Sequence, residues 1–285
     1  MLAERLPGLL PPLDLAAALE VTAVHSVAGA LPADQPLVRH PPFANPHHTA
    51  TVAALVGGGS GLARPGTVSL AHRGVLFLDE APEFPARALD ALRQPLESGE
   101  VVLARADGTV RFPARFTLVL AANPCACAGA SGSGTGCSCT AQARRRYLAR
   151  LSGPLLDRID LQVTLRAVRR VDMRADRGTV EGSEVVRVRV AAARERAAAR
   201  LAGTPWRTNA ELPPRDLRRR FAPHPSATRL VETAMRRGRL SARGVDRVLR
   251  IAWTVADLRG HDGPGFDDVA EALTLRIGHE AGVAA

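Results

Sequence analysis

The sequence of 285 residues contains no lysine, so its 38 basic residues other than histidine are all arginine. Walker A phosphate-binding loops, Schiff-base enzymes and protein kinases each depend on a lysine side chain. None of these sites is therefore complete within this sequence.

Long hydrophobic runs are also missing. No run approaches the roughly 18 consecutive apolar residues of a membrane-spanning helix, and the first residues, which include Glu4 and Arg5, lack the layout of a signal peptide. We therefore expect a cytoplasmic protein. Hydrophobic residues make up 46% and charged residues 23% of the chain, which is the balance of a globular protein with a core.

The net charge of +10 is unevenly distributed. Residues 1–100 hold 6 arginines and 10 acidic residues, residues 101–250 hold 30 and 12, and residues 251–285 hold 2 and 6. A basic middle between acidic ends indicates a surface that faces a polyanion such as a nucleic acid. The alternative is an arginine-rich protein whose ordinary solvent-exposed faces carry the excess.

The length leaves room for one large domain or two ordinary ones. Hydrophobic patterns predict an α/β part followed by a helical part, and we place the domains at 1–170 and 171–285. In the first part we expect a helix up to about Gly29, a helix at 86–97, a hairpin at 100–112 and buried strands at 75–78, 117–122 and 159–165. In the second part we expect helices at 183–201, 226–237, 241–259 and 266–277.

Two carboxylates, Asp79 and Glu80, directly follow the apolar run at 75–78. The carboxyl ends of strands in an α/β sheet form its ligand-binding edge. In nucleotide hydrolases the first acid of such a pair holds Mg²⁺, and the second can polarise the water that attacks the γ-phosphate. An acidic pair after an apolar strand also arises by chance.

Three later polar residues follow in the order that a nucleotide hydrolase requires, and each also has an ordinary explanation. Asn123 ends the next strand and can orient the attacking water, or it can simply start an Asn-Pro turn. Arg158 can reach a neighbouring subunit's γ-phosphate, or it can pair with Asp157 or Asp160. Arg243 opens a helix and can contact phosphate, but Ser241 beside it also suits plain capping.

All four cysteines, Cys125, Cys127, Cys137 and Cys139, lie within a C-x-C-x₉-C-x-C pattern. Four thiolates around a glycine-rich spacer can close a tetrahedral Zn²⁺ site, although C-x₂-C is the more usual spacing. A redox disulfide pair and loop cysteines without a ligand are the alternatives. The tandem pair His47-His48 suggests a role near a nucleotide or a subunit interface, or ordinary loop hydrogen bonds.

Together these segments resemble the AAA+ ATPases of the magnesium-chelatase-like group, and in particular the YifB/ComM family. The resemblance covers nearly the whole chain and rests on several long words: PHHTA (46–50), RPGTVSLAHRGVLFLDE (64–80), FPARFTLVLAANPC (112–125), RRRYLARLSGPLLDRIDL (144–161) and SARGVDRVLRIAWTVADL (241–258).

The resemblance implies a P-loop-type parallel-sheet core with a helical lid, a hexameric ring, ATP and Mg²⁺ as cofactors, and ATP-driven work on DNA. It implies that Asp79 and Glu80 form the Walker B motif, Asn123 is sensor 1, Arg158 is the arginine finger and Arg243 is sensor 2. It also implies that residues 100–112 form the hairpin that points into the channel of related rings. Residues that could meet DNA phosphates are Arg105 and Arg111 on this hairpin, and Arg144, Arg145 and Arg146.

The sequence departs from the family at its start. Family members carry a glycine-rich loop ending in Gly-Lys-Ser/Thr just before a segment like residues 1–11, and neither that loop nor the preceding strand is in this sequence. We expect a truncated product, a wrongly assigned start or one piece of a split gene, and a chain that does not hydrolyse ATP well alone.

Three functions remain open at this stage. The first is a DNA-acting AAA+ motor subunit of the helicase or branch-migration type. The second is a motor subunit of a magnesium chelatase, which drives metal insertion into a porphyrin. The third is a catalytically inactive module that binds zinc or DNA, or that caps a ring of complete subunits.

Overall fold

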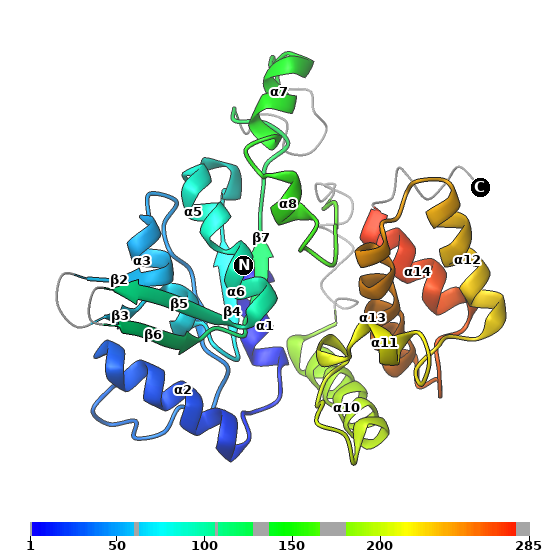
Figure 1. Ribbon diagram of the computed structural model, residues 1–285, viewed down its shortest axis with the longest axis horizontal. Coiled ribbons are helices and arrows are strands. Elements are labelled where there is room, and N and C mark those ends of the chain that lie inside the picture. Colours follow the sequence, from blue (N-terminus) through cyan, green and yellow to red (C-terminus); the bar gives the residue numbers. More distant parts are fainter. Residues whose placement is uncertain (1, 60–62, 106–107, 128–136, 166–180, 278–285) are drawn as a thin grey trace. The chain divides into compact units, whose positions relative to one another are not determined.

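A computed structural model describes residues 2–59, 63–105, 108–127, 137–165 and 181–277 (Figure 1). The chain forms two compact units, Met1–Arg158 with Ala167–Ser183, and Ile159–Arg166 with Glu184–Ala285. The first is a mixed α/β unit built around a parallel sheet and the second is helical, which confirms the predicted fold class. No helix in the described part of the chain is long and apolar enough to cross a bilayer.

The parallel sheet of the first unit has three strands in the order β1 (Phe43–Ala44), β4 (Val75–Leu78), β7 (Thr117–Leu120). All four residues of β4 are buried, as its uninterrupted apolar run predicts, whereas β7 is only partly buried and ends before the predicted Ala122. At the start of β4, a Cβ on Gly74 would lie 2.0 Å from the Pro42 carbonyl oxygen. Glycine at this position therefore allows the chain that leads into β1 to cross closely.

Short helices and two antiparallel hairpins surround this sheet. The helices are α1 (Leu2–Leu9), α2 (Leu15–Ala28), α3 (Val52–Val56), α4 (Thr67–Leu70), the 3₁₀ helix η1 (Ala81–Glu83), α5 (Ala86–Ala91), α6 (Arg93–Ser98), α7 (Ala141–Leu148) and α8 (Gly153–Leu156). One hairpin pairs β2 (Gly57–Gly58) with β3 (Arg64–Pro65), and the other pairs β5 (Glu100–Arg105) with β6 (Gly108–Pro113). The second hairpin confirms the predicted one, although Asp107 of its expected turn lies outside the described residues.

Three predicted elements differ in the structure. The first predicted helix is two helices, because Pro11 and Pro12 interrupt it. The helix predicted at 86–97 divides into α5 and α6 at Leu92. The predicted strand at 159–165 is wrong, because this segment pairs with no strand among the described residues. It lies in the second unit, where the Gln162 amide donates to the Leu275 carbonyl at 2.7 Å.

Within the first unit, the buried side chain of His72 connects Glu20 of α2 to the backbone at Arg115. The His72 side chain is 2% exposed, and its Nδ1 accepts from the Arg115 amide at 3.0 Å, so Nε2 carries the proton that faces Glu20 Oε2 at 3.2 Å. Arg73 donates to the same carboxylate oxygen at 3.0 Å. Burial alone would raise the pKa of Glu20, but the hydrogen bonds from His72 and Arg73 lower it.

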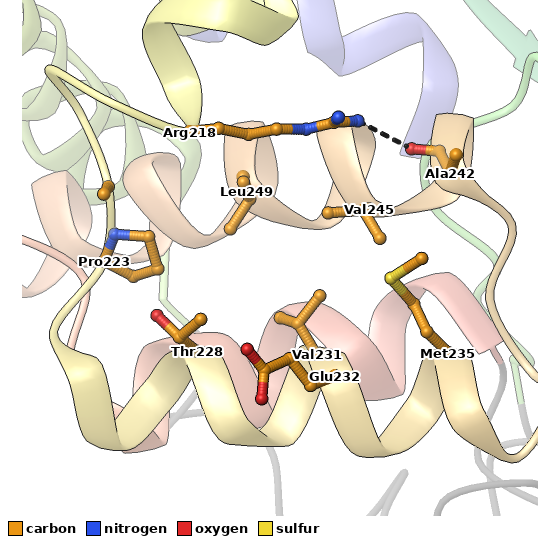
Figure 2. Close-up of a pocket in the computed structure, with 10 residues that line it drawn as sticks. Arg218, Pro223, Thr228, Val231, Glu232, Met235, Ala242, Val245 and Leu249 are labelled. Carbon is orange, nitrogen blue, oxygen red and sulfur yellow. Dashed lines mark hydrogen bonds between the residues drawn. The ribbon is translucent and has the colours of Figure 1, made fainter.

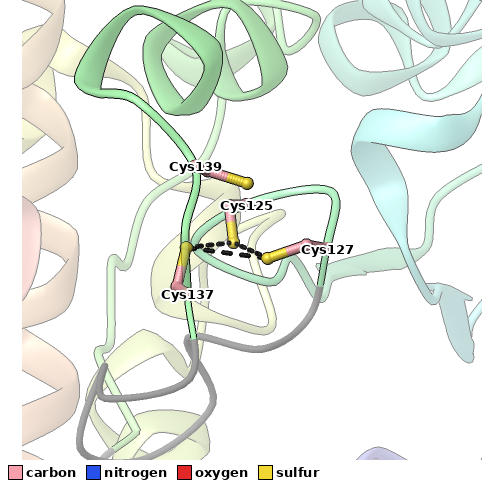
Figure 3. A group of neighbouring side chains, drawn as sticks. All are labelled: Cys125, Cys127, Cys137 and Cys139. Atoms are coloured by element: carbon pink, nitrogen blue, oxygen red, sulfur yellow. Dashed lines mark hydrogen bonds between the residues drawn. The ribbon is translucent and has the colours of Figure 1, made fainter.

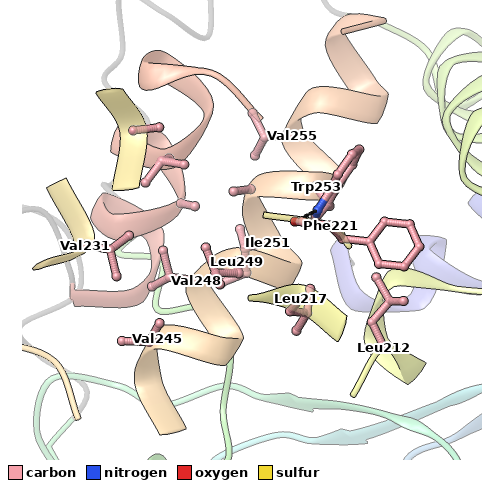
Figure 4. Packing of buried hydrophobic residues seen from close by; sticks show 14 of the residues in the cluster. Leu212, Leu217, Phe221, Val231, Val245, Val248, Leu249, Ile251, Trp253 and Val255 are labelled. Carbon is pink, nitrogen blue, oxygen red and sulfur yellow. Dashed lines mark hydrogen bonds between the residues drawn. The ribbon is translucent and has the colours of Figure 1, made fainter. Parts of the chain in front are cut away.

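The helical unit consists of α10 (Ser183–Leu201), the 3₁₀ helix η2 (Asn209–Glu211), α11 (Pro214–Leu217), α12 (Pro225–Arg236), α13 (Ala242–Arg259) and α14 (Phe266–Ile277). Helix α13 runs through the middle of its core, with Val248 and Ala252 fully buried (Figure 4). The Trp253 indole packs edge-to-face on Phe221 at 6.0 Å and donates to the Phe221 carbonyl at 2.9 Å. The periodic pattern that predicted α13 is therefore the pattern of its buried face.

A polar cluster ties the two ends of this unit together. The Asp257 carboxylate is 2% exposed and accepts from both terminal nitrogens of Arg200 and from the Asn209 amide, the latter at 2.8 Å. The Arg200 guanidinium also lies 4.0 Å over the Trp253 ring. These donors satisfy the buried carboxylate, and removal of one partner would leave another polar or charged group of the cluster unpaired.

Candidate functional site

The polar residues Asp79, Glu80 and Asn123 all leave the same edge of the sheet. Strands β4 and β7 are parallel and paired up to Leu78 and Leu120, and beyond the ladder the Ala81 amide donates to the Ala121 carbonyl at 2.8 Å. The chains that carry the two carboxylates and the asparagine amide therefore stay side by side. Carboxylate and amide oxygens are ligands that suit Mg²⁺, and such an edge is where α/β proteins bind nucleotides.

Glu80 has an unusual backbone conformation. Its φ of 50° and ψ of 42° lie in the left-handed region, which disfavours residues other than glycine and asparagine. The Asp79 side chain accepts from the Glu80 amide at 3.0 Å, and the Glu80 carbonyl accepts from the Glu83 amide at 2.7 Å. Strain of this kind occurs often at functional sites, and the Glu80 carboxylate is half-exposed.

The tandem histidines lie beside this carboxylate. His48 Nδ1 lies 3.5 Å from Glu80 Oε2, and the ring of His47 is tilted by 34° against that of His48 with the centroids 4.0 Å apart. His47 Nδ1 also lies 2.9 Å from the Thr49 hydroxyl. The structure therefore places His48 at the candidate site, and it gives His47 an ordinary loop contact.

The chain that follows α7 returns to the turn beside Glu80. Arg150 Nη1 donates to the Pro82 carbonyl at 3.2 Å and to Glu83 Oε2 at 2.8 Å. Tyr147 is buried close by, and its burial and then the charges of Glu83 and Glu80 raise the pKa of its phenol.

The four cysteines form a compact cluster after Asn123 (Figure 3), with their Sγ atoms all within 4.8 Å of one another. Cys125 Sγ lies 3.2 Å from that of Cys127 and 3.3 Å from that of Cys137, and the Cys127–Cys137 separation is 3.6 Å. None is in a disulfide. Tetrahedral Zn²⁺ with bonds of about 2.3 Å holds its sulfur ligands a little under about 4 Å apart.

The donor set and spacing of this cluster therefore fit a structural zinc site. Hydrogen bonds from the neighbouring thiols, Cys127 foremost, raise the pKa of Cys139 to about 12.

The arginines assigned from the sequence lie in different surroundings. The Arg158 side chain is 10% exposed, binds Glu97 and donates to the Pro154 carbonyl at 2.7 Å, and Asp160 instead pairs with Arg247 at 2.6 Å. Arg111 is exposed and paired with Glu100. The remaining candidates include exposed residues of α7 and α13, namely Arg144, Arg145, Arg146 and Arg243; Arg105 ends β5, and its side chain lies outside the described residues.

The helical unit contains a separate cavity of about 260 Å³ between α12 and α13 (Figure 2). Its walls are mostly apolar and include Val231, Met235 and Leu249. Arg218 at its edge donates to the Asp246 carboxylate at 2.9 Å and to the Ala242 carbonyl at 3.3 Å. None of the residues predicted for catalysis, metal binding or DNA binding lines it.

Sequence reasoning did not identify the pair Arg150 and Glu83. Arg150 lies in the segment 144–161 that carries the family resemblance, but nothing in that segment indicates its partner, and 67 positions separate the two residues in the chain. For His48, the sequence pattern suggested a nearby nucleotide, but it did not indicate the contact with Glu80.

Comparisons with known proteins cover both units. Residues 1–173 match the family described as magnesium chelatase, subunit ChlI, and residues 180–276 match the family described as magnesium chelatase, subunit ChlI C-terminal. An uncharacterized protein of Mycobacterium tuberculosis is 58% identical over 276 residues, which are 97% of this chain and 54% of that protein.

Two further relatives carry informative names. The competence protein ComM of Haemophilus influenzae is 42% identical over 282 residues, and the uncharacterized protein YifB of Escherichia coli is 40% identical over 276 residues. Each match covers 97% of this chain and 53% of the relative. The chain thus spans about half the length of the curated relatives that it matches.

Proposed function

Because the chain belongs to the magnesium chelatase ChlI family of AAA+ proteins, among relatives that include YifB and ComM, we propose that it is part of an ATP-driven motor that acts on DNA by helicase or branch-migration activity. The observation that carries this proposal is the placement of Asp79, Glu80 and Asn123 at one edge of adjacent parallel strands. The likeness to a competence protein supports DNA as the partner.

In this proposal the core, residues 1–170, supplies the catalytic carboxylates. Asp79 holds Mg²⁺, Glu80 polarises the attacking water, and Asn123 orients it. Arg243, in a lid formed by residues 171–285, contacts the nucleotide phosphates as sensor 2. Mg²⁺ would offset the charge that gathers on the phosphate oxygens during transfer.

Arg158 acts in the proposed motor as an arginine finger toward the neighbouring subunit of a hexameric ring. Its ion pair with Glu97 would hold the guanidinium in a fixed place until a phosphate competes for it. A motor that consumes ATP and acts on DNA would work in the cytoplasm.

Hydrolysis also requires a lysine that contacts the β- and γ-phosphates, and the 285 residues contain none. We therefore propose that this chain alone does not turn over ATP, and that its carboxylates act with a Walker A loop outside these residues. Nothing in the sheet edge described above replaces that lysine.

The DNA-facing surface is proposed to be the hairpin β5–β6, with Arg105 and Arg111, together with the α7 arginines Arg144, Arg145 and Arg146. Contacts between arginine and phosphate are independent of sequence and sensitive to salt, which suits a motor that moves along DNA. Zinc bound by the four cysteines would fix the loop that leads into α7.

The rival motor function is metal insertion into a porphyrin. The magnesium-chelatase 38 kDa subunit of Cereibacter sphaeroides is 31% identical to this chain, but only over 112 residues, 39% of its length. The longer match to ComM favours the DNA function. A catalytically inactive module that binds zinc or DNA, or caps a ring, is the second alternative.

One experiment separates these functions. The product of the complete gene, whatever its length, and the 285-residue chain are both purified, and each is tested for binding of duplex DNA and for ATP turnover with and without that DNA. The motor proposal expects turnover by the first protein and binding without turnover by the second. DNA binding with no turnover by either would favour the inactive module, and no binding by either would contradict the DNA function.

A further inference from the structure

Helix α7 presents different residues to solvent and to the core of its unit. It begins directly after the last cysteine, where the Thr140 hydroxyl accepts from the Ala143 amide at 3.2 Å and caps the helix. Arg144, Arg145 and Arg146 are exposed, whereas Tyr147 is 6% exposed. One short helix thus joins a basic surface to a buried contact.

The half-exposed Arg150 side chain contacts the turn that follows Glu80. Arg150 lies two residues after α7 and binds both the Pro82 carbonyl and the Glu83 carboxylate. Both acceptors belong to η1, the 3₁₀ turn at Ala81–Glu83. The ion pair with Glu83 and the hydrogen bond to the Pro82 carbonyl together connect this turn to the segment that follows α7.

The turn itself is short and tightly hydrogen-bonded. The Glu83 amide donates to the Glu80 carbonyl at 2.7 Å, and the Ala81 amide donates to the Ala121 carbonyl of the neighbouring chain at 2.8 Å. Ala81 and Pro82 are buried. Glu80 and Glu83 are joined by a single hydrogen-bonded turn. A displacement of Glu83 therefore also displaces the strained backbone of Glu80.

We propose that α7 couples occupancy of its arginine surface by nucleic-acid phosphates to the position of Glu80, through the contacts of Arg150 with Pro82 and Glu83. Arg150 is in this view a positioning residue, and the regulating ligand is a phosphate-bearing polymer. The inference rests on the proposed function for its ligand and for the role of Glu80, but it adds the route between them.

Hydrogen exchange of the 285-residue chain tests this route without any need for ATP turnover. We expect saturating duplex DNA to slow exchange of the amides of Ala81, Glu83 and Phe84 by about threefold to tenfold, because the turn opens less often when α7 is held. In Arg150→Ala, DNA should bind with an unchanged Kd while the exchange of these three amides no longer responds. Glu83→Gln should show a partial loss, because the Pro82 contact remains.

Arg87→Ala provides the matched control, since Arg87 is an exposed arginine on α5. It should keep both the Kd and the exchange response of the wild type. An Arg150→Ala chain whose turn still responds fully to DNA would overturn the route, and so would a wild-type turn that ignores bound DNA. Absence of DNA binding by the wild type would overturn the inference and, with it, the DNA partner of the proposed function.

A second readout applies to the product of the complete gene. Arg150→Ala should remove the effect of DNA on kcat for ATP while leaving KM for ATP unchanged, because the nucleotide-binding groups are untouched. A purely structural contact would instead lower thermal stability and basal kcat together and leave the ratio of stimulated to basal kcat as it was.

Discussion

At the scale of single residues, Glu80 combines a strained backbone with three fixed neighbours. A residue other than glycine in the left-handed region costs of the order of 1 kcal/mol, and hydrogen bonds to Asp79 and Glu83 hold Glu80 there. His48 approaches the carboxylate from another loop. Backbone strain of this kind is common at functional sites, and here it coincides with a half-exposed carboxylate at the sheet edge.

Substitution of that carboxylate should separate binding from turnover. In the product of the complete gene, Glu80→Gln should bind ATP with a Kd close to wild type but lower kcat by about 10²- to 10⁴-fold, because an amide cannot take a proton from water. Equilibrium binding and steady-state hydrolysis measure the two effects. Asp34→Asn, an exposed surface change, is the control, and normal turnover by Glu80→Gln would refute the assigned role.

The buried carboxylate Asp257 accepts hydrogen bonds from both Arg200 and Asn209 in the helical unit. Asp257→Ala leaves the Arg200 guanidinium and the Asn209 amide without their acceptor, so we expect a loss of about 3–5 kcal/mol in the free energy of unfolding. Glu195→Ala on the exposed face of α10 should change it by less than about 0.5 kcal/mol. Urea denaturation followed by circular dichroism compares the two, and equal losses would contradict this account.

The contact of Glu20 with His72 and Arg73 should depend on pH. The folded protein lowers the pKa of Glu20 below its ordinary value of 4.5, so the contact stabilises fully above pH 4.5 and is lost as the pH falls through the lowered value. Glu20→Gln should therefore cost about 1 kcal/mol at neutral pH and progressively less in acid. The free energies of unfolding of the wild type and of Glu20→Gln are compared by urea denaturation at several pH values. A difference between them that does not decrease as the pH falls below 4.5 would disprove the linkage.

At the scale of elements, the cysteine cluster should determine whether α7 is held in place. We expect the native chain to carry one equivalent of zinc and Cys137→Ser to lose it, because three thiolates and a hydroxyl bind Zn²⁺ far less tightly. Ser138→Ala changes the adjacent exposed residue and should keep its zinc. Elemental analysis by mass spectrometry measures the zinc content of each chain. If the wild-type chain holds no zinc after refolding in the presence of zinc, the proposed site is wrong.

Local signals predicted the elements well where hydrophobic period and capping agree. The ranges of α10 and α14 match the predicted ones, and Ser241 caps α13 where the pattern starts. The strand predicted at 159–165 does not form, and the reason is physical. Alternating apolar residues also suit an extended segment that packs on helices without pairing with a strand. Its partners are in α13 and α14, more than 80 positions away.

The candidate site was predictable only in part for the same reason. Asp79, Glu80 and Asn123 are readable because each follows an apolar strand, and parallel strands bring such ends together. The contacts of Glu80 with His48 and of Glu83 with Arg150 depend on how loops fold over the sheet. No short-range pattern in the sequence encodes them.

At the scale of the whole molecule, the excess positive charge is distributed over both units. Several arginines of the helical unit form ion pairs within that unit, which balance their charge. Examples are Arg200 with Asp257, Arg218 with Asp246 and Arg259 with Asp268. Net charge alone therefore does not locate a polyanion surface. The run Arg144–Arg146 on α7 is exposed and follows the cysteine cluster, whereas in the exposed run Arg218–Arg220 the first arginine pairs with Asp246.

This difference can be measured through the salt dependence of DNA binding. Each phosphate neutralised contributes about −0.9 to the slope of log K against log salt for duplex DNA, so replacing Arg144, Arg145 and Arg146 together by alanine should reduce the steepness of that slope by about 2–3. The matched control replaces Arg215, Arg219 and Arg229, which are exposed arginines of the helical unit, and so removes the same net charge. Fluorescence anisotropy at several salt concentrations gives both slopes. If the slope becomes less steep by the same amount in both triple variants, the protein attracts DNA through its overall charge and not through α7 in particular. If the slope becomes less steep only in the α7 variant, the basic surface next to the cysteine cluster is the one that binds the phosphates.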